Sequence, residues 1–182
     1  MRGLVILAVL LAAAPAQAQA QALSPSPVDL LAPPVDYASL TIAISLRPLA
    51  WGGGADFDLT IKGDGSVNFV PGPPARGGET EGPPRSGTIS RATLDALLTQ
   101  FRLAGFAQMQ PYYDSGVTDQ ARLELNVTTA LGTRRISFDY FYPDRDGTRR
   151  FRRQLDFIDC VIDLGLRAVS LKFLPQPCPG AP

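Results

Sequence analysis

The densest group of side chains that could bind a ligand is a run of arginines near the C-terminal end of the chain. Arg149, Arg150, Arg152 and Arg153 stand within one short segment. Guanidinium groups bind carboxylates and phosphates through paired hydrogen bonds, so the run is a candidate surface for an anionic glycan, a lipid headgroup or an acidic partner. The alternative is a solvated helix face on which Arg152 pairs with Asp156 at four-residue spacing. Cations in the first turns of a helix oppose its dipole, and a cost that is kept without a benefit to stability sometimes marks a binding site.

Trp51 is a second candidate for contact with a partner. It is the only tryptophan, and Gly52, Gly53 and Gly54 follow it in a predicted loop between strands. Tryptophan often anchors an interface. The alternative is that its ring plugs the end of a sheet.

Acidic side chains offer a different class of chemistry, hydrolysis by carboxylates alone, with Asp56, Asp58 and Asp119 as candidates. The chain contains no histidine, which excludes Ser-His and Cys-His nucleophile pairs, an imidazole base and a zinc site with histidine ligands. Asp56 and Asp58 share the solvent face of a predicted strand. We therefore assign no catalytic, cofactor-binding or metal-binding residue, and the composition favours a protein that is not an enzyme.

The N-terminal region predicts export. Arg2 precedes the uncharged apolar run Leu4–Ala14, which is shorter than the roughly 20 residues that span a bilayer. Small residues at alternate positions follow, so signal peptidase can cleave after Ala18, Ala20 or Ala22. The sequence predicts a signal peptide over 1–22 and a periplasmic or secreted mature protein with no transmembrane segment. The alternative is an uncleaved anchor.

The rest of the chain divides by composition. Residues 23–37 are rich in proline, alanine and serine and predict a flexible leader. A single domain is expected over 38–173, followed by a proline-rich tail over 174–182. Lysine and arginine together number 17, as do aspartate and glutamate, so no global field attracts nucleic acid.

The two cysteines, Cys160 and Cys178, predict a disulfide, because the export signal implies an oxidising compartment. The bond would staple the tail to the last helix. The alternative is a buried Cys160 and a free Cys178.

Alternating apolar residues predict strands. They cover 40–47, 56–62, 66–70, 122–129 and 134–141, with a further short strand near Thr88 and Ile89. Gly63-Asp64-Gly65 predicts a hairpin turn, and 71–87 is a long loop rich in proline and glycine.

Two helices follow from helical spacing of apolar residues. The first has Ser90 as its N-cap and Gly105 after its end. The last is capped by Asp146 or Thr148 and carries an apolar stripe of Phe151, Leu155, Ile158 and Ile162. We expect an α+β fold, an antiparallel sheet of five to six strands with two helices packed on one face.

Several motifs together resemble a bacterial family of exported proteins, the domain of unknown function 6438. They are Arg47, then Asp58 to Val67, Ile89, the segment Leu97–Phe106, and Tyr113 with Ser115 to Asp119. The resemblance covers roughly Leu40 to Leu166. It implies no catalytic or binding residue. A segment with two cysteines that follows the arginine in that family is here Pro48–Ala55, which contains none.

The sequence thus leads to an exported, non-catalytic binding or accessory module of the cell envelope. Its expected partner is an envelope protein or an anionic glycan, and no cofactor is expected. The alternatives are an inhibitor of an envelope enzyme and a periplasmic hydrolase that uses only carboxylates.

Overall fold

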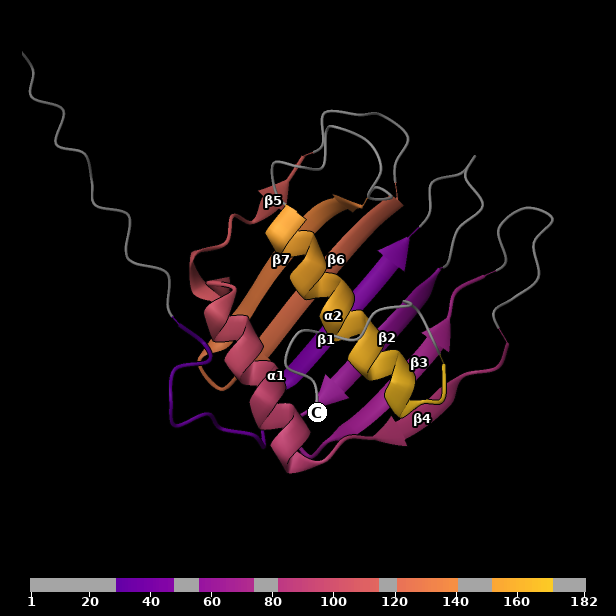
Figure 1. The fold of residues 1–182 in the computed structure, drawn as a ribbon, viewed down its shortest axis with the longest axis horizontal. Coiled ribbons are helices and arrows are strands. Elements are labelled where there is room, and N and C mark those ends of the chain that lie inside the picture. Colours follow the sequence, from indigo (N-terminus) through magenta and orange to yellow (C-terminus); the bar gives the residue numbers. More distant parts are fainter. Residues whose placement is uncertain (1–28, 48–55, 74–81, 115–120, 141–151, 172–182) are drawn as a thin grey trace, which may run out of the picture.

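The computed structural model describes residues 29–47, 56–73, 82–114, 121–140 and 152–171. Within these ranges the chain forms one mixed sheet of seven strands, two α-helices and a short 3-10 helix, which is an α+β fold (Figure 1). The strands are β1 (Thr41–Arg47), β2 (Phe57–Lys62), β3 (Ser66–Pro71), β4 (Arg85–Thr88), β5 (Tyr112–Tyr113), β6 (Ala121–Thr129) and β7 (Gly132–Tyr140). Their order in space is β4-β3-β2-β1-β6-β7-β5, so β1 lies at the centre.

The period-two patterns form strands as predicted. Along β1, Ile42, Ile44 and Leu46 are buried, whereas the residues between them are only partly covered. The predicted hairpin joins β2 to β3: Gly65 has a positive φ of 85°, and the Asp64 carboxylate accepts a hydrogen bond from the backbone N–H of Ser66 at 2.8 Å. A residue with a side chain would be strained at that φ.

The expectation of a purely antiparallel sheet of five to six strands is wrong. Within the described residues the sheet has a seventh strand, β5, and this strand runs parallel to β7. It consists of Tyr112 and Tyr113 alone, so it is too short to show alternation. Packing holds it at the edge instead, because the ring of Tyr113 stacks on Phe138 with centroids 4.8 Å apart.

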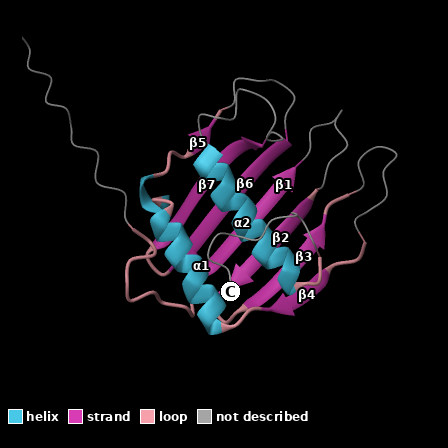
Figure 2. Cartoon of the chain, in the orientation of Figure 1, coloured by secondary structure: helices cyan, strands magenta, loops and turns pink. Residues whose placement is uncertain are grey.

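Both helices cover the same face of the sheet, as predicted (Figure 2). The first, α1 (Arg91–Leu103), begins after Ser90, whose hydroxyl accepts a hydrogen bond from the Thr93 N–H at 3.1 Å. Gly105 follows its end with a φ of 69°. Both caps therefore lie where the sequence places them. The helix is followed by the 3-10 helix η1 (Phe106–Gln108).

The second helix, α2 (Arg152–Ala168), packs across β2, β3 and β4. The Phe157 ring meets Phe101 of α1 edge to face, with centroids 4.8 Å apart. Gly165 lets the helix approach the sheet closely, because a Cβ at this position would lie 2.5 Å from Cδ2 of Leu59. The predicted caps Asp146 and Thr148 lie outside the described residues.

The chain before β1 differs from the predicted flexible leader. From Asp29 onward it packs on the domain, and Leu31 is only 1% exposed within the core. The carbonyl oxygen of Leu31 accepts a hydrogen bond from Nε of Arg102 at 3.0 Å. The adjacent Leu30 and Leu31 are both buried, and this burial stabilises a segment whose proline-rich composition predicts flexibility. The folded unit therefore begins before residue 38.

Candidate functional site

One face of the sheet carries the helices, and no described element covers the other, which we call the open face (Figure 1). At its centre β1 contributes Thr41, Ala43 and Ser45, which are small. The flanking strands add polar side chains: Asp58, Thr60, Asn68, Glu124, Asn126, Thr128, Arg135 and Ser137. The open face therefore offers mainly hydrogen-bonding groups.

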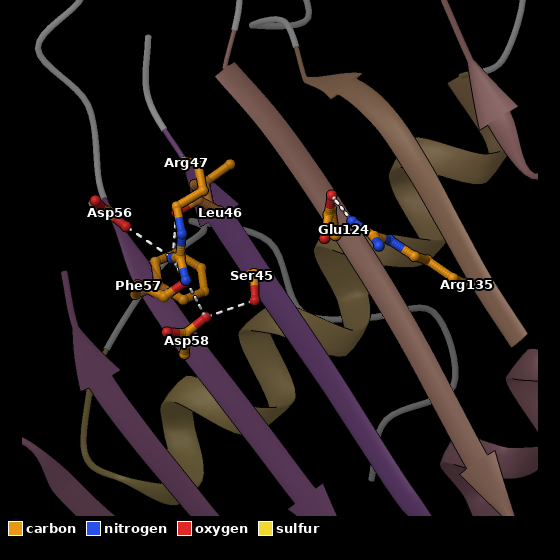
Figure 3. A network of polar contacts seen from close by, with 8 residues as sticks. All are labelled: Ser45, Leu46, Arg47, Asp56, Phe57, Asp58, Glu124 and Arg135. Atoms are coloured by element: carbon orange, nitrogen blue, oxygen red, sulfur yellow. Dashed lines mark hydrogen bonds and ion pairs between the residues drawn. The ribbon is translucent and has the colours of Figure 1, made fainter. Parts of the chain in front are cut away.

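One end of the open face holds an ionic cluster of Ser45, Arg47, Asp56 and Asp58, which we call the Arg47 cluster (Figure 3). Nη1 of Arg47 lies 2.8 Å from Oδ1 of Asp56, and Nη2 lies 2.6 Å from Oδ1 of Asp58. Nη1 also donates to two backbone carbonyl oxygens, and the Ser45 hydroxyl donates to Asp58 at 2.5 Å. Burial lowers the pKa of Arg47, but the hydrogen bond and charge of Asp58, with the charge of Asp56, outweigh this effect and raise it.

A charged row continues across the sheet from this cluster. The register places Arg47 opposite Arg122 and Arg122 opposite Asp139. The Tyr112 hydroxyl donates to Oδ1 of Asp139 at 2.9 Å, and this bond raises the pKa of Tyr112. The Arg122 guanidinium lies 5.8 Å from the centre of the Tyr112 ring. Cationic, acidic and aromatic groups thus share one end of the open face.

The same end is where connecting segments leave and rejoin the sheet. These segments are 48–55, 74–81, 115–120 and 141–151, which lie outside the described residues. Their flanking residues are aligned by the register, since Leu46 pairs with Phe57, Phe57 with Pro71, and Ala121 with Tyr140.

The predicted binding residues belong to these segments or adjoin them. Trp51, Arg149 and Arg150 lie outside the described residues, and so does Asp119. Arg152 and Arg153 begin α2, where the structure describes their backbone. Figure 1 shows that α2 begins near the end of the sheet where β7 ends. The helix α2 therefore begins at the end of the sheet that holds the Arg47 cluster, and in the sequence the segment that contains Trp51 directly follows Arg47.

The arrangement of Asp56 and Asp58 favours a structural role over catalysis. The structure brings both to the open face, where one guanidinium binds one oxygen of each. Hydrolysis by two carboxylates requires that both direct oxygens at the substrate. One acts as general acid, and the other acts as base or nucleophile. In the described ranges no group of three or more Asp, Glu or Cys side chains could hold a metal ion.

Cys160 lies on α2 and is 8% exposed. Cys178 lies outside the described residues, so the disulfide between them stays a prediction. Among the helices that the structure describes, none is long and apolar enough to cross a membrane.

Several residues of this end could not be identified from the sequence. Glu124 and Arg135 form an ion pair between β6 and β7, and Figure 3 shows it on the same face as the Arg47 cluster. Tyr112 joins the charged row only because β5 exists. The sequence shows only that a charged residue stands at an outward position of a strand. This pattern does not predict which residue of a neighbouring strand forms the ion pair.

No model of a known protein family matches this chain. A search of curated proteins also found no match.

Proposed function

We propose that this protein is an exported, non-catalytic binding module that works outside the cytoplasm and captures an envelope partner. The observation that carries the proposal is the convergence of the Arg47 cluster, the Arg122–Tyr112–Asp139 row and the ends of four connecting segments at one end of the sheet. Binding residues are found disproportionately on segments that a rigid scaffold positions. The seven-stranded sheet is that scaffold.

The chemistry of this end supports a polar, charged partner. Arg122 is exposed, and its guanidinium lies 5.8 Å from the centre of the Tyr112 ring, while Arg47 is held by carboxylates. The arginine run at 149–153 would add cations from a neighbouring segment. An acidic envelope protein or an anionic glycan is the partner class that such a surface would attract. Inhibition of an envelope enzyme is one form that capture of a protein could take.

Membership of the family of domain of unknown function 6438 is part of the proposal. Two of the residues that carry the resemblance, Arg47 and Asp58, are ion-paired at 2.6 Å. This contact gives the motif a structural role at the proposed binding end.

The test is capture of partners from envelope extract by the mature protein and two charge-reversed variants, followed by mass spectrometry. Arg122→Glu changes an exposed cation at the proposed end, and Lys62→Glu changes an exposed cation at the other end of the open face. We expect Arg122→Glu to lose at least about nine tenths of the captured partner, because reversing a charge at an interface opposes association. Lys62→Glu should retain it.

Two outcomes contradict the proposal. Equal capture by both variants would remove the Arg122 end as the binding surface. Hydrolysis of an envelope substrate that disappears in Asp58→Asn, with the melting temperature kept, would instead establish the carboxylate hydrolase.

A further inference from the structure

A groove on the helical side of the molecule, away from the open face, is lined by two arginine side chains and an apolar wall. It is a cavity of about 480 Å³ between α1 and the chain before β1. Its lining residues are Pro33, Pro34, Val35, Tyr37, Arg91, Asp95, Leu98, Thr99 and Arg102. This volume falls within the range of about 300–1,000 Å³ that small-molecule sites occupy.

The wall on α1 follows from helical geometry. Arg91, Asp95, Leu98 and Arg102 recur at spacings of four, three and four residues, so they share one face of the helix. Arg91 and Arg102 stand at the two ends of this face, and Leu98 lies between them. The opposite wall is apolar, with Pro33, Pro34 and Val35.

Both arginines are oriented through Nε. Nε of Arg91 donates to Oδ1 of Asp95 at 3.2 Å, and the Arg91 guanidinium carbon lies 3.1 Å from the centre of the Tyr37 ring. Nε of Arg102 donates to the carbonyl oxygen of Leu31 at 3.0 Å. The Arg91 guanidinium also interacts with the Tyr37 hydroxyl. For Arg102, no hydrogen bond from an Nη atom is found within the described residues. Arg102 therefore presents the two terminal nitrogens that bind a carboxylate or phosphate, and Arg91 adds a second positive charge.

The one carboxylate that lines the groove is already engaged. Oδ1 of Asp95 accepts the Tyr37 hydroxyl at 2.5 Å as well as Nε of Arg91. Two guanidinium groups against one carboxylate leave the lining with an excess positive charge. Local charge thus complements an anion, whereas the whole chain is neutral.

We propose that this groove binds a small organic anion, a carboxylate or phosphate attached to an apolar body. The acidic group binds the Nη atoms of Arg102, where the charge of Arg91 also attracts it, and the body lies against Val35, Leu98 and the proline rings. The site is independent of the proposed binding end of the sheet, because different residues on the other side of the molecule form it.

The experiment is a titration of the mature protein, followed by amide chemical shifts, with three probes. Phenyl phosphate carries both the anion and the apolar body, inorganic phosphate only the anion, and benzyl alcohol only the body. We expect saturable shifts with phenyl phosphate at Val35, Tyr37, Asp95 and Thr99. Each of the other two probes should bind at least about tenfold more weakly, because a charge-assisted hydrogen bond or a buried ring is worth more than 1.4 kcal/mol.

Matched variants locate the site. Arg102→Gln and Arg91→Gln should each weaken phenyl phosphate about tenfold or more. Lys62→Gln removes an exposed cation from the other end of the open face and should leave the affinity unchanged. Arg102→Lys keeps the charge without the paired donors and should bind with an intermediate affinity, which separates loss of the anion contact from loss of folding.

Shifts centred on other residues, equal weakening by Lys62→Gln, or binding of benzyl alcohol as tight as that of phenyl phosphate would each overturn the proposal. None of these outcomes depends on capture by the Arg47 end. Failure here and failure of the proposed function are therefore distinguishable.

Discussion

Arg47 and Asp58 are joined diagonally across two neighbouring strands, with Nη2 and Oδ1 2.6 Å apart. In the register Asp58 stands opposite Ser45, whose hydroxyl also donates to it. The guanidinium reaches back along the strand to Asp58 while it also binds Asp56. Four groups from β1 and the start of β2 thus fix one another at the end of the sheet where the first connecting segment begins.

Replacement of Arg47 by alanine should lower the free energy of unfolding by about 1 kcal/mol. The Arg47 and Asp58 side chains are each 46% exposed, so their ion pair contributes little by itself, but the guanidinium also binds Asp56 and two backbone carbonyls. Urea unfolding measures the change. Arg135→Ala, which breaks one ion pair with Glu124, is the control and should cost less. Equal effects would contradict a special role for the Arg47 cluster.

Gly165→Ala should destabilise the protein by about 1–3 kcal/mol, because the new methyl group would meet Cδ2, Cδ1 and Cγ of Leu59 at 2.5, 3.0 and 3.1 Å. The sign of the change in stability tests this contact, because in a helix with free space around the glycine the same substitution stabilises by up to about 1 kcal/mol. Thermal unfolding measures it. Adding Leu59→Val should recover part of the loss, and a stabilised single variant would disprove this packing.

The Tyr37–Asp95 hydrogen bond predicts a dependence of stability on pH at both extremes. The Tyr37 hydroxyl lowers the pKa of Asp95, so this contribution is present above the unfolded pKa near 3.8 and is lost as the pH falls through the folded pKa. The same bond raises the pKa of Tyr37, so its contribution is present below pH 10 and is lost as the pH rises further.

Melting temperatures of wild type and Tyr37→Phe, measured from pH 2 to 11, check this linkage. The variant should be less stable at neutral pH, and the two curves should converge at both extremes. A constant difference across the range would show that the bond does not titrate.

The predicted Cys160–Cys178 disulfide should appear as a linked pair in peptide maps made without reductant. Cys178→Ser should then lower the free energy of unfolding by up to about 3 kcal/mol, the value for a loop of this size in the chain-entropy model. Reduced wild type serves as the control. Quantitative thiol labelling of both cysteines in the native protein would show that the bond is absent.

Processing of the export signal should leave a mature N-terminus within 19–23. Intact-mass analysis of protein recovered from the periplasm or the medium measures it. Retention of Met1 on most molecules would instead support an uncleaved anchor.

The sequence by itself determined the elements whose signal is local. Period-two alternation follows from the geometry of an extended chain, so Ile42, Ile44 and Leu46 mark the buried face of β1 without reference to any other strand. The Ser90 cap and the turn at Gly65 are equally local, because each satisfies backbone groups or a φ value within a few residues.

Only the tertiary structure decided which residues meet. Arg47 reaches Asp58, and Tyr112 reaches Asp139, through strand register and an added edge strand, which depend on the packing of the whole sheet. The same holds for the chain around Leu31, whose composition predicts flexibility until α1 provides a surface that buries it. Long-range contacts of this kind are stabilised by apolar surface that two distant segments bury together. The pattern within one segment therefore does not predict which other segment it contacts.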